Sequence, residues 1–410
     1  MKNYLLIFMV SFLFGCHTKG TSTSEIAVPA IFSSADQQDI QTWENARKPQ
    51  LLDLFEKNVY GKFDDSGIQV SYQLTDQDPS ALCGKAIRKN VKMFFVKDTD
   101  SVAVDLLIYL PKKAQHQAVP LFLGLNFFGN HTIHFDPNIP LTNSPVNNKA
   151  EFCINNNKVT ELSRGVRAYR WPVERLIDRG YGLATIYYGD LDPDFDDGFK
   201  NGLHKLSGPN DLNSSISAWA YGLSEAMNYF EIDDQINPHQ IAVLGHSRLG
   251  KAALWAGAND PRFALVISND SGCGGAALSR RKKGETFSDI NHSFPHWFCK
   301  KFHQYNDKEE LLPVDQHMLI ACIAPRPIYI ASAQKDQWAD PEGEFLSLKY
   351  ASQVYRLWNT ETMGNQIFPA VNQPIWKANM AYHIRSGAHD ITRYDWEQYL
   401  NFADRCFAHK

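Results

Sequence analysis

The sequence contains Ile241-Ala242-Val243-Leu244-Gly245-His246-Ser247-Arg248-Leu249-Gly250-Lys251, and this stretch decides the fold. The apolar run before Gly245 predicts a buried strand, and a helix is predicted to begin near Ser247. A serine on a sharp turn between a strand and a helix has the arrangement of a nucleophile elbow. The positive end of such a helix favours negative charge that develops beside the hydroxyl. We therefore predict that Ser247 is a nucleophile rather than an ordinary N-cap, although Gly250 falls one place later than in Gly-x-Ser-x-Gly.

Strands and helices alternate on both sides of this turn. Apolar runs predict strands at residues 91–96, 102–110, 120–125, 181–188, 264–268 and 327–332. Helical spacing predicts helices at residues 214–230, 342–357 and 395–406, and a pair of helices at 39–59 that is interrupted at Pro49. This order implies parallel β-α-β units with right-handed connections. The expected fold class is α/β, a doubly wound and mostly parallel sheet between two helical layers, which together with the elbow predicts an α/β-hydrolase fold.

Several segments, in this order, make the sequence similar to the glucuronoyl esterases, which are carbohydrate esterase family 15. They are Leu125-Asn126-Phe127-Phe128-Gly129-Asn130, Gly245-His246-Ser247-Arg248-Leu249-Gly250-Lys251, Ser271-Gly272-Cys273-Gly274-Gly275-Ala276, Ala324-Pro325-Arg326-Pro327, Trp338-Ala339-Asp340-Pro341 and Gly387-Ala388-His389. The resemblance runs from about Trp43 to the C-terminus. It implies a serine esterase that needs no cofactor and cleaves esters of glucuronic or 4-O-methyl-glucuronic acid on xylan through an acyl-enzyme. The partners it implies are glucuronoxylan or uronate-ester oligosaccharides.

A serine hydroxyl needs a base, usually a histidine that a carboxylate orients. His389 is the predicted base, because it stands in a glycine-containing loop before the last helix and matches the family's histidine. His383 stands in an apolar stretch and is predicted to be a buried structural residue. Asp336 is the preferred acid, because it follows the strand predicted at 327–332, where an α/β-hydrolase usually carries its acid. Asp270 is the alternative, because many family members carry a glutamate at that place.

The resemblance also assigns residues around the nucleophile. Arg248 is expected to help bind the oxyanion, together with backbone N–H groups. Lys251 lies one helical turn after Ser247 and is expected to contact sugar hydroxyls. Glu285 and Trp338 match the family's sugar-binding glutamate and tryptophan.

Two other functions remain open at this point. The same machinery could act on other esters, such as the acetyl groups of xylan. A chain that has lost its catalysis could instead bind glycans at the surface, although the full Ser, His and Asp set argues against it.

Charge and metal-ligand patterns exclude other classes of function. The net charge of −4 provides no field that recruits nucleic acid, and the run Arg280-Arg281-Lys282-Lys283 is short enough to be a cleft rim. Asp192-Pro193-Asp194-Phe195-Asp196-Asp197-Gly198 lacks the glutamate that closes a calcium loop, so it is interpreted as a solvated acidic loop. His131 and His134 are expected to lack a carboxylate partner nearby. We therefore expect no metal.

The first residues predict export. Met1-Lys2 is positive, residues 4–14 are apolar but too short to span a bilayer, and residues 1–15 therefore predict a signal peptide. The ending Leu13-Phe14-Gly15-Cys16 resembles a bacterial lipobox, which implies lipidation of Cys16 and attachment to a periplasmic or outer-membrane surface. Residues 16–30 are then a tether, and residues 31–410 are one catalytic domain with an N-terminal extension of helices and strands.

Six cysteines remain after Cys16, and no Cys-x-x-Cys pair occurs among them. An even number in an exported protein permits disulfides, but the sequence does not select among the possible pairings. Alternatively, several of these cysteines are buried free thiols.

Overall fold

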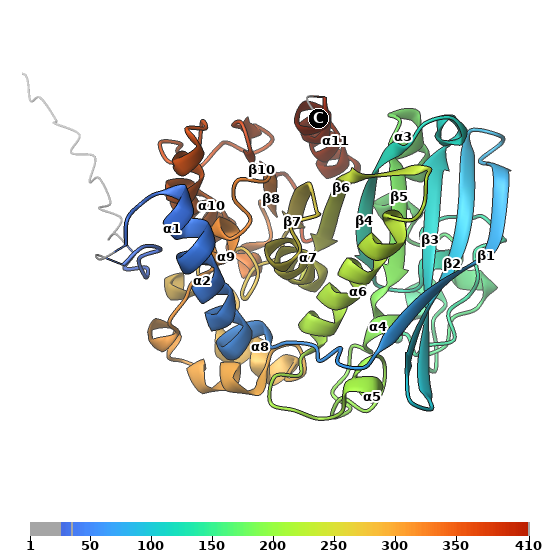
Figure 1. The fold of residues 1–410 in the computed structure, drawn as a ribbon, viewed down its shortest axis with the longest axis horizontal. Coiled ribbons are helices and arrows are strands. Elements are labelled where there is room, and N and C mark those ends of the chain that lie inside the picture. Colours follow the sequence, from blue (N-terminus) through green and yellow to red (C-terminus); the bar gives the residue numbers. More distant parts are fainter. Residues whose placement is uncertain (1–25, 34–35, 409–410) are drawn as a thin grey trace, which may run out of the picture.

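The computed structural model of the protein describes residues 26–33 and 36–408. Its centre is a ten-stranded sheet with the order β1-β2-β3-β5-β4-β6-β7-β8-β10-β9, which crosses the molecule from β1 at the right of Figure 1 to β10 at the left. The strands are β1 (Gln69–Ala81), β2 (Ala86–Lys97), β3 (Asp100–Pro111), β4 (Val119–Asn126), β5 (Gly182–Tyr187), β6 (Ile236–His246), β7 (Leu265–Asn269), β8 (Ile328–Ala333), β9 (Ile375–Trp376) and β10 (Met380–Arg385).

The central strands of this sheet are parallel. β4 pairs in parallel with β5 and β6, and the parallel pairing continues through β7 and β8 to β10. β1, β2 and β3 form an antiparallel extension that joins the sheet at β5, and β9 is antiparallel at the other edge. The predicted α/β fold with a mostly parallel sheet is thus confirmed, and the strands predicted from residue 91 to residue 332 all form.

Helices cover both faces of the sheet. One apolar core includes side chains of α2, α6, α7, α9 and α10, and a second core includes side chains of α3 and α11. Alternate residues of β6 enter different cores, with Val243 in the first and Leu244 in the second. Both faces of β6 are therefore buried, which explains its continuous apolar run. The helices are α1 (Ile40–Thr42), α2 (Lys48–Phe55), α3 (Val173–Asp178), α4 (Tyr188–Leu191), α5 (His204–Ser207), α6 (Ser215–Phe230), α7 (Arg248–Asn259), α8 (Phe287–Ser293), α9 (Gln316–Ala321), α10 (Pro341–Tyr355) and α11 (Arg393–Phe407).

The prediction of two separate helices at residues 39–59 is wrong. The segment is one helical run in which π-helical turns at Trp43–Arg47 and Glu56–Tyr60 follow α1 and α2. Pro49 stands in the first turn of α2, directly after the first π-helical turn, where the N–H of Lys48 bonds to the carbonyl of Trp43. The wider turn accommodates the missing N–H of the proline, so the run continues.

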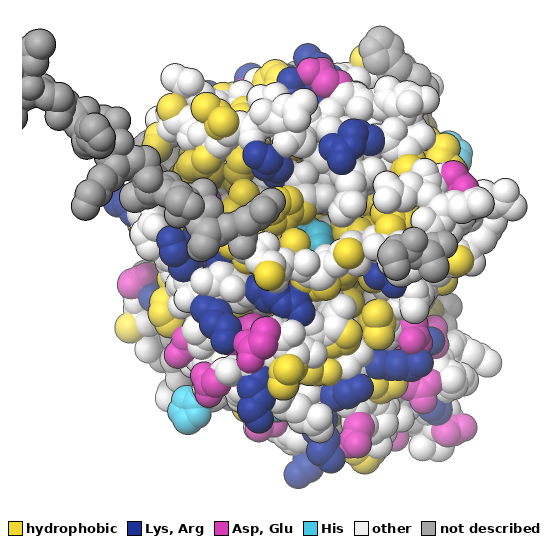
Figure 2. Space-filling view, turned by 90° about the vertical axis from the view of Figure 1, so that its left-hand side faces the viewer, with side chains coloured by type: hydrophobic (Ala, Val, Ile, Leu, Met, Phe, Trp, Pro, Cys, Tyr) yellow, Lys and Arg dark blue, Asp and Glu magenta, His cyan; other side chains and the backbone are white. Residues whose placement is uncertain are grey.

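The predicted signal peptide (residues 1–15), Cys16 and the tether up to residue 25 lie outside the described residues, and the proposed domain boundaries remain predictions. Within residues 26–33 and 36–408, no helix has both the length and the apolar character that a bilayer-spanning helix needs. On the side of the molecule that carries α1, α2 and α10, basic and acidic side chains are interspersed (Figure 2).

The prediction of buried free thiols is confirmed at three positions, and two further cysteines are free but exposed. Cys273, Cys299 and Cys322 are buried, and burial raises the pKa of the Cys322 thiol to about 12. The five free thiols are Cys83, Cys153, Cys273, Cys299 and Cys322.

Candidate active site

Ser247 stands on a strained turn between β6 and α7. Its φ is 58° and its ψ is −131°, a conformation that a residue with a side chain rarely adopts. The turn doubles back so closely that a Cβ at Gly245 would lie 1.9 Å from the carbonyl oxygen of Leu249. A Cβ at Gly250 would lie 2.9 Å from the Cβ of Ser271. Both glycines are therefore required by close packing, and the later position of Gly250 fits α7 against the segment after β7.

The hydroxyl of Ser247 does not cap the helix that it precedes. Its Oγ lies 2.9 Å from Nε2 of His389, and Nδ1 of His389 lies 2.5 Å from Oδ2 of Asp336. The His389 side chain is 43% exposed, whereas that of Asp336 is 6% exposed. A hydroxyl, an imidazole and a carboxylate in this order form the arrangement that nucleophilic catalysis requires, and it is open to solvent at the imidazole.

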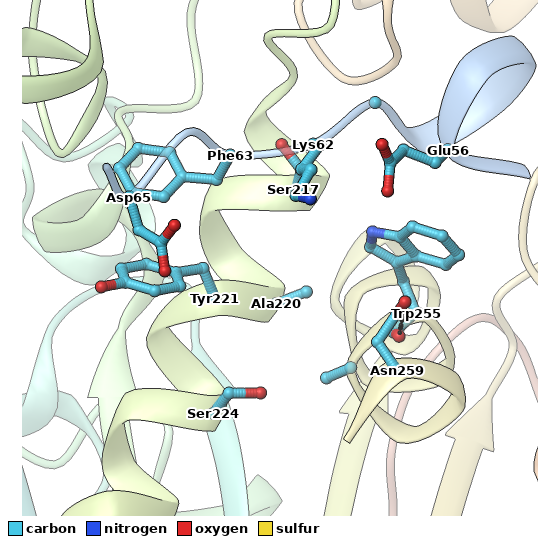
Figure 3. A pocket seen from close by; sticks show the side chains of 12 residues that line it. Glu56, Lys62, Phe63, Asp65, Ser217, Ala220, Tyr221, Ser224, Trp255 and Asn259 are labelled. Atoms are coloured by element: carbon cyan, nitrogen blue, oxygen red, sulfur yellow. Dashed lines mark hydrogen bonds between the residues drawn. The ribbon is translucent and has the colours of Figure 1, made fainter. Parts of the chain in front are cut away.

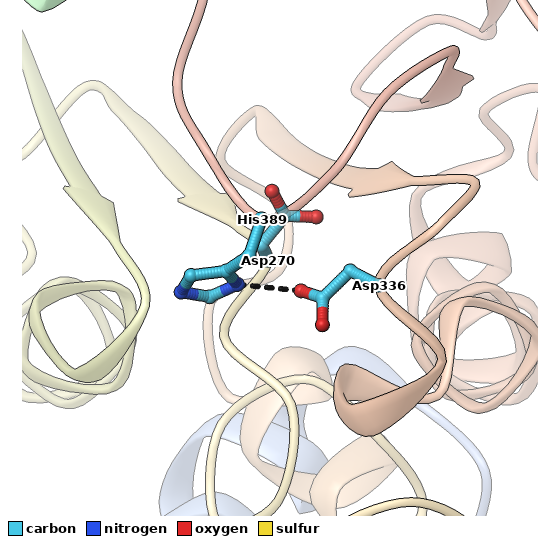
Figure 4. Close-up of side chains that lie close together, drawn as sticks. All are labelled: Asp270, Asp336 and His389. Carbon is cyan, nitrogen blue, oxygen red and sulfur yellow. Dashed lines mark hydrogen bonds and ion pairs between the residues drawn. The ribbon is translucent and has the colours of Figure 1, made fainter.

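Asp270 lies close to this chain of hydrogen bonds but is not part of it. One ligand atom from each of Asp270, Asp336 and His389 lies within 4.8 Å of the others, yet the hydrogen bond in Figure 4 joins only Asp336 to His389. The partner of Asp270 is the guanidinium of Arg385, 3.3 Å from Oδ2, and its Oδ1 is buried without a partner. Burial raises the pKa of Asp270 well above its ordinary value, nearby Glu344 adds to this, and Arg385 opposes it.

Arg248 follows Ser247 at the start of α7, and three contacts hold its side chain. It forms an ion pair with Asp194, and its guanidinium carbon lies 4.4 Å from the ring centre of Trp297 and 4.9 Å from that of Phe294. The side chain is 21% exposed, and its Nε is buried without a hydrogen-bond partner. These contacts fix the guanidinium and leave its Nε as an unpaired donor.

Lys251 is buried, and its Nζ donates to the carbonyls of Ser271 and Cys273, each at 2.6 Å. Burial lowers the pKa of Lys251, and the charge of Glu285 opposes this effect. The backbone N–H of Glu285 donates to the carbonyl of Trp338 at 2.9 Å, and the Trp338 side chain is 56% exposed. The structure thus brings together the three residues that the sequence assigned to sugar binding, but it ties the lysine to backbone carbonyls.

Comparisons with known proteins show which family the chain belongs to. Residues 182–359 match a family model described as glucuronyl esterase, fungi. The chain is 53% identical over 370 residues to carbohydrate esterase MZ0003 from an unknown prokaryotic organism, covering 88% of this chain and 84% of that protein. The structure of a glucuronoyl esterase from Solibacter usitatus matches with a TM-score of 0.87 and 41% identity, over 94% of this chain and 98% of that one. The chain belongs to the glucuronoyl esterase family.

A more distant relative matches a smaller part of the chain. The 4-O-methyl-glucuronoyl methylesterase 1 of Phanerochaete chrysosporium is 33% identical over 205 residues, which is 45% of this chain and 43% of that protein. The match to this fungal protein thus covers about half as much of the chain as the match to the Solibacter usitatus structure.

Sequence reasoning missed the role of Asp194 in this family member. The acidic segment at 192–198 is a solvated loop, as predicted, only in its second half, where Asp196 is exposed; Asp192 is buried and the Asp194 side chain is 3% exposed. Asp194 accepts hydrogen bonds from His296 at 3.1 Å, Trp297 at 2.7 Å and Tyr188 at 2.7 Å, besides its ion pair with Arg248. Burial works to raise the pKa of Asp194, but these hydrogen bonds and Arg248 hold it below its ordinary value. Only the folded chain brings these partners together.

The candidate metal ligands of the sequence have other partners. Asp192 accepts a hydrogen bond from the hydroxyl of Ser215 at 2.5 Å. His131 bonds to Ser163 at 2.9 Å. His134 does have a carboxylate nearby, contrary to the sequence-based reading, because folding places Glu174 at 3.0 Å.

His246 and His383 are buried histidines of this glucuronoyl esterase that do not take part in the hydrogen bonds from Ser247 to Asp336. The ring of His246 lies 4.6 Å from that of His389, and its Nδ1 bonds to Asn269 Oδ1 at 2.6 Å. Burial lowers the pKa of His246 well below its ordinary value. His383 is fully buried and bonds to Asp395 at 2.9 Å, which confirms it as a structural histidine.

A pocket of about 250 Å³ lies away from these residues, between α6 and α7 and the segment 56–65 (Figure 3). Tyr221 and Trp255 are among its aromatic lining residues, and none of its lining residues belongs to the Ser247, His389 and Asp336 cluster. Phe63 and Trp255 are each only 5% exposed, so they offer no open ring face for a sugar. The pocket therefore does not compete with the cluster as the active site.

Proposed function

We propose that the chain hydrolyses esters of glucuronic acid or 4-O-methyl-glucuronic acid on xylan, through an acyl-enzyme on Ser247. The observation that carries the proposal is the pair of hydrogen bonds from Ser247 through His389 to Asp336, with His389 open to solvent. The names of the relatives in Solibacter usitatus and Phanerochaete chrysosporium support the uronate part of the substrate.

The first half of the reaction forms the acyl-enzyme. Oγ of Ser247 attacks the ester carbonyl while Nε2 of His389 takes the hydroxyl proton, and Asp336 stabilises the imidazolium that forms. The tetrahedral oxyanion faces the guanidinium of Arg248 and the N–H groups at the very start of α7, ahead of Gly250, whose own N–H donates to the carbonyl of Ser247. One such donor contributes about 3–4 kcal/mol to the transition state. His389 then returns the proton to the alcohol that leaves.

The second half consumes water. His389 accepts a proton from a water molecule whose oxygen attacks the acyl carbonyl, and the same donors bind the second oxyanion. Collapse of this intermediate releases the uronic acid, and the proton returns to Oγ of Ser247. No group outside the chain takes part in these steps except water.

The residues beside the nucleophile are proposed to hold the sugar. Trp338 forms an exposed aromatic wall, and Glu285 is tied to it by a backbone hydrogen bond, so the carboxylate can accept from sugar hydroxyls at the base of that wall. Lys251 has one ammonium proton left after its two carbonyl contacts, and this proton is proposed to bind a sugar hydroxyl.

A substrate panel tests this function. We expect kcat/KM for a methyl ester of glucuronic acid to exceed that for an aryl acetate and for acetylated xylan by about tenfold or more, because a satisfied set of polar contacts discriminates between substrates. If the acetate esters are cleaved as fast as the glucuronate ester or faster, the alternative function as an acetyl xylan esterase would be favoured. If the wild type binds xylan fragments without hydrolysing them, and Ser247→Ala binds them with equal affinity, the alternative function as a glycan-binding protein would be favoured.

The same panel tests the sugar contacts. In Glu285→Gln and Trp338→Ala, KM for the uronate ester should rise about tenfold, the value of one lost polar or stacking contact, while KM for the aryl acetate stays within about twofold. Ile367→Ala is the control, because Ile367 is 82% exposed and lies in a different loop. A parallel rise of KM for both esters would contradict a sugar-specific role.

Export and lipid attachment are proposed from the first residues. Cys16 is expected to carry the lipid, and the resemblance of residues 13–16 to a lipobox supports this. When the full chain is produced in a bacterial host with a labelled fatty acid, the label should enter wild type and be lost in Cys16→Ser, which should leave the membrane fraction. Equal labelling of both proteins would show that Cys16 is not the modified residue.

A further inference from the structure

Arg385 lies at the end of β10, and the loop that carries His389 folds around its guanidinium. The side chain is 2% exposed. Its Nη2 donates to the carbonyl of Ala388 at 3.0 Å and to that of Asp390, and its Nη1 donates to the carbonyl of Ser386 at 3.1 Å. The carbonyls of Ala388 and Asp390, the two residues that flank His389, therefore converge on one nitrogen.

Two carboxylates hold the guanidinium from the other side. Nε of Arg385 lies 2.8 Å from Oδ2 of Asp395, and Nη2 lies 3.3 Å from Oδ2 of Asp270. Asp395 is itself fixed, because it caps the start of α11 through Thr392 and accepts from His383. A buried guanidinium needs such partners, and its planar donors can satisfy carboxylates and carbonyls at the same time. The loop is thus joined rigidly to α11 and to the end of β7.

The same segment also sets the position of Asp336. The N–H of Gln334 donates to the carbonyl of Arg385 at 2.8 Å, and the N–H of Lys335 donates to the carbonyl of Gly387 at 2.9 Å. Gly387 has a φ of 106°, and a Cβ there would lie 3.1 Å from Nη1 of Arg385. The close approach of the loop to the guanidinium therefore requires a glycine at this position.

We infer that Arg385 is the positioning residue for His389, and that Asp270 acts as the counter-ion of Arg385 rather than as an acid of the hydrolytic cluster. This inference rests on the proposed function, because it assigns His389 as the base. Arg385 does not touch the substrate. It acts by holding the main chain on both sides of His389, so that Nε2 stays within reach of Ser247 while Nδ1 stays on Asp336.

Two variants test this role. Arg385→Lys keeps the positive charge, but an ammonium cannot reach three carbonyls and two carboxylates from one point. The double variant Arg385→Gln with Asp270→Asn removes one charge of each sign, so it leaves less unpaired charge in the interior than Arg385→Gln alone. In both, we expect kcat on an aryl acetate to fall about a hundredfold, the cost of misplacing a reacting group by about 1 Å, with KM within about twofold.

Two further measurements separate positioning from general stability. Modification of Ser247 by an aryl phosphonate should slow by a similar factor, and the far-downfield proton resonance of His389 Nδ1–H, bonded to Asp336, should weaken. Arg326→Lys is the matched control. Arg326 likewise donates to three backbone carbonyls, those of Gly257, Asp260 and Phe263, but these lie at the far end of α7. It should lower the melting temperature without lowering kcat.

A folded Arg385→Lys with wild-type kcat and an unchanged His389 resonance would overturn the inference. So would an equal loss of kcat in Arg326→Lys, which would assign the effect to stability alone. The phosphonate reaction and the resonance do not depend on a sugar ester. A wild type that hydrolyses no uronate ester would therefore overturn the proposed substrate and leave this test intact.

Discussion

Ser247→Ala should lower kcat for ester hydrolysis by about a millionfold, the scale of loss when the serine is removed from a Ser-His-Asp set. The alanine keeps the backbone of the turn but removes the only hydroxyl within hydrogen-bond reach of His389 Nε2 in the described part of the chain. No acyl-enzyme can then form. Any hydrolysis that remains requires direct attack of water on the ester, and the donors of α7 then bind the oxyanion that this attack produces. The measurement is hydrolysis of an aryl acetate and of a methyl glucuronate ester by both proteins, with mass spectrometry of the phosphonate-treated enzyme to detect modification.

Ser386→Ala is the matched control for this change. Ser386 is exposed, lies three residues before His389 and contacts Arg385 only through its backbone carbonyl. Its variant should therefore hydrolyse both esters within about twofold of wild type. Residual turnover of Ser247→Ala within a hundredfold of wild type would show that another group attacks the ester, and the acyl-enzyme mechanism would fail.

The alternation of strands and helices could be predicted because each central strand is buried on both faces and carries few polar residues. β1 and β10 could not be found in this way, for opposite reasons. β1 is an edge strand whose residues are mostly exposed, so it has neither an apolar run nor a clear alternation. β10 is fully buried, but it contains the polar residues His383 and Arg385, which interrupt its apolar run and bond to Asp395 of α11.

The candidate site divides in the same way. Ser247 and His389 stand in short glycine-containing segments that can be recognised from neighbouring residues alone, and the structure places the two side chains in contact. Asp194 and Arg385 gave no such signal, because Arg248 lies 54 residues from Asp194, Asp270 lies 115 residues from Arg385, and other partners of Arg385 are backbone carbonyls. Asp194 meets Arg248, and Arg385 meets Asp270, only after the sheet has formed. Position along the chain also left both Asp270 and Asp336 open as the acid, since each follows a parallel strand at the same edge of the sheet.

Asp336→Asn is expected to lower kcat about ten-thousandfold, whereas Asp270→Asn should lower it about tenfold or less. An asparagine at 336 keeps the shape of the contact but presents either an amide N–H or a weaker acceptor to Nδ1, so it no longer holds the tautomer that leaves Nε2 free to accept from Ser247. An asparagine at 270 still offers an oxygen to Arg385. The chain of hydrogen bonds from Ser247 through His389 to Asp336 does not include Asp270, so its substitution acts on the imidazole only through Arg385 and the loop.

The order of the two losses decides which aspartate completes the cluster. Initial rates on the aryl acetate, which needs no sugar contact, should be compared at equal folded fraction from thermal unfolding. A larger loss in Asp270→Asn would reverse the assignment, and comparable losses would mean that the two carboxylates, both within reach of His389, share the role. In the double variant Asp270→Asn with Asp336→Asn, the fold loss of kcat should equal the product of the two single losses. The reason is that Asp270 acts through Arg385 and the loop rather than on the imidazole. A double loss much greater than this product would instead show that Asp270 takes over the imidazole when Asp336 is gone.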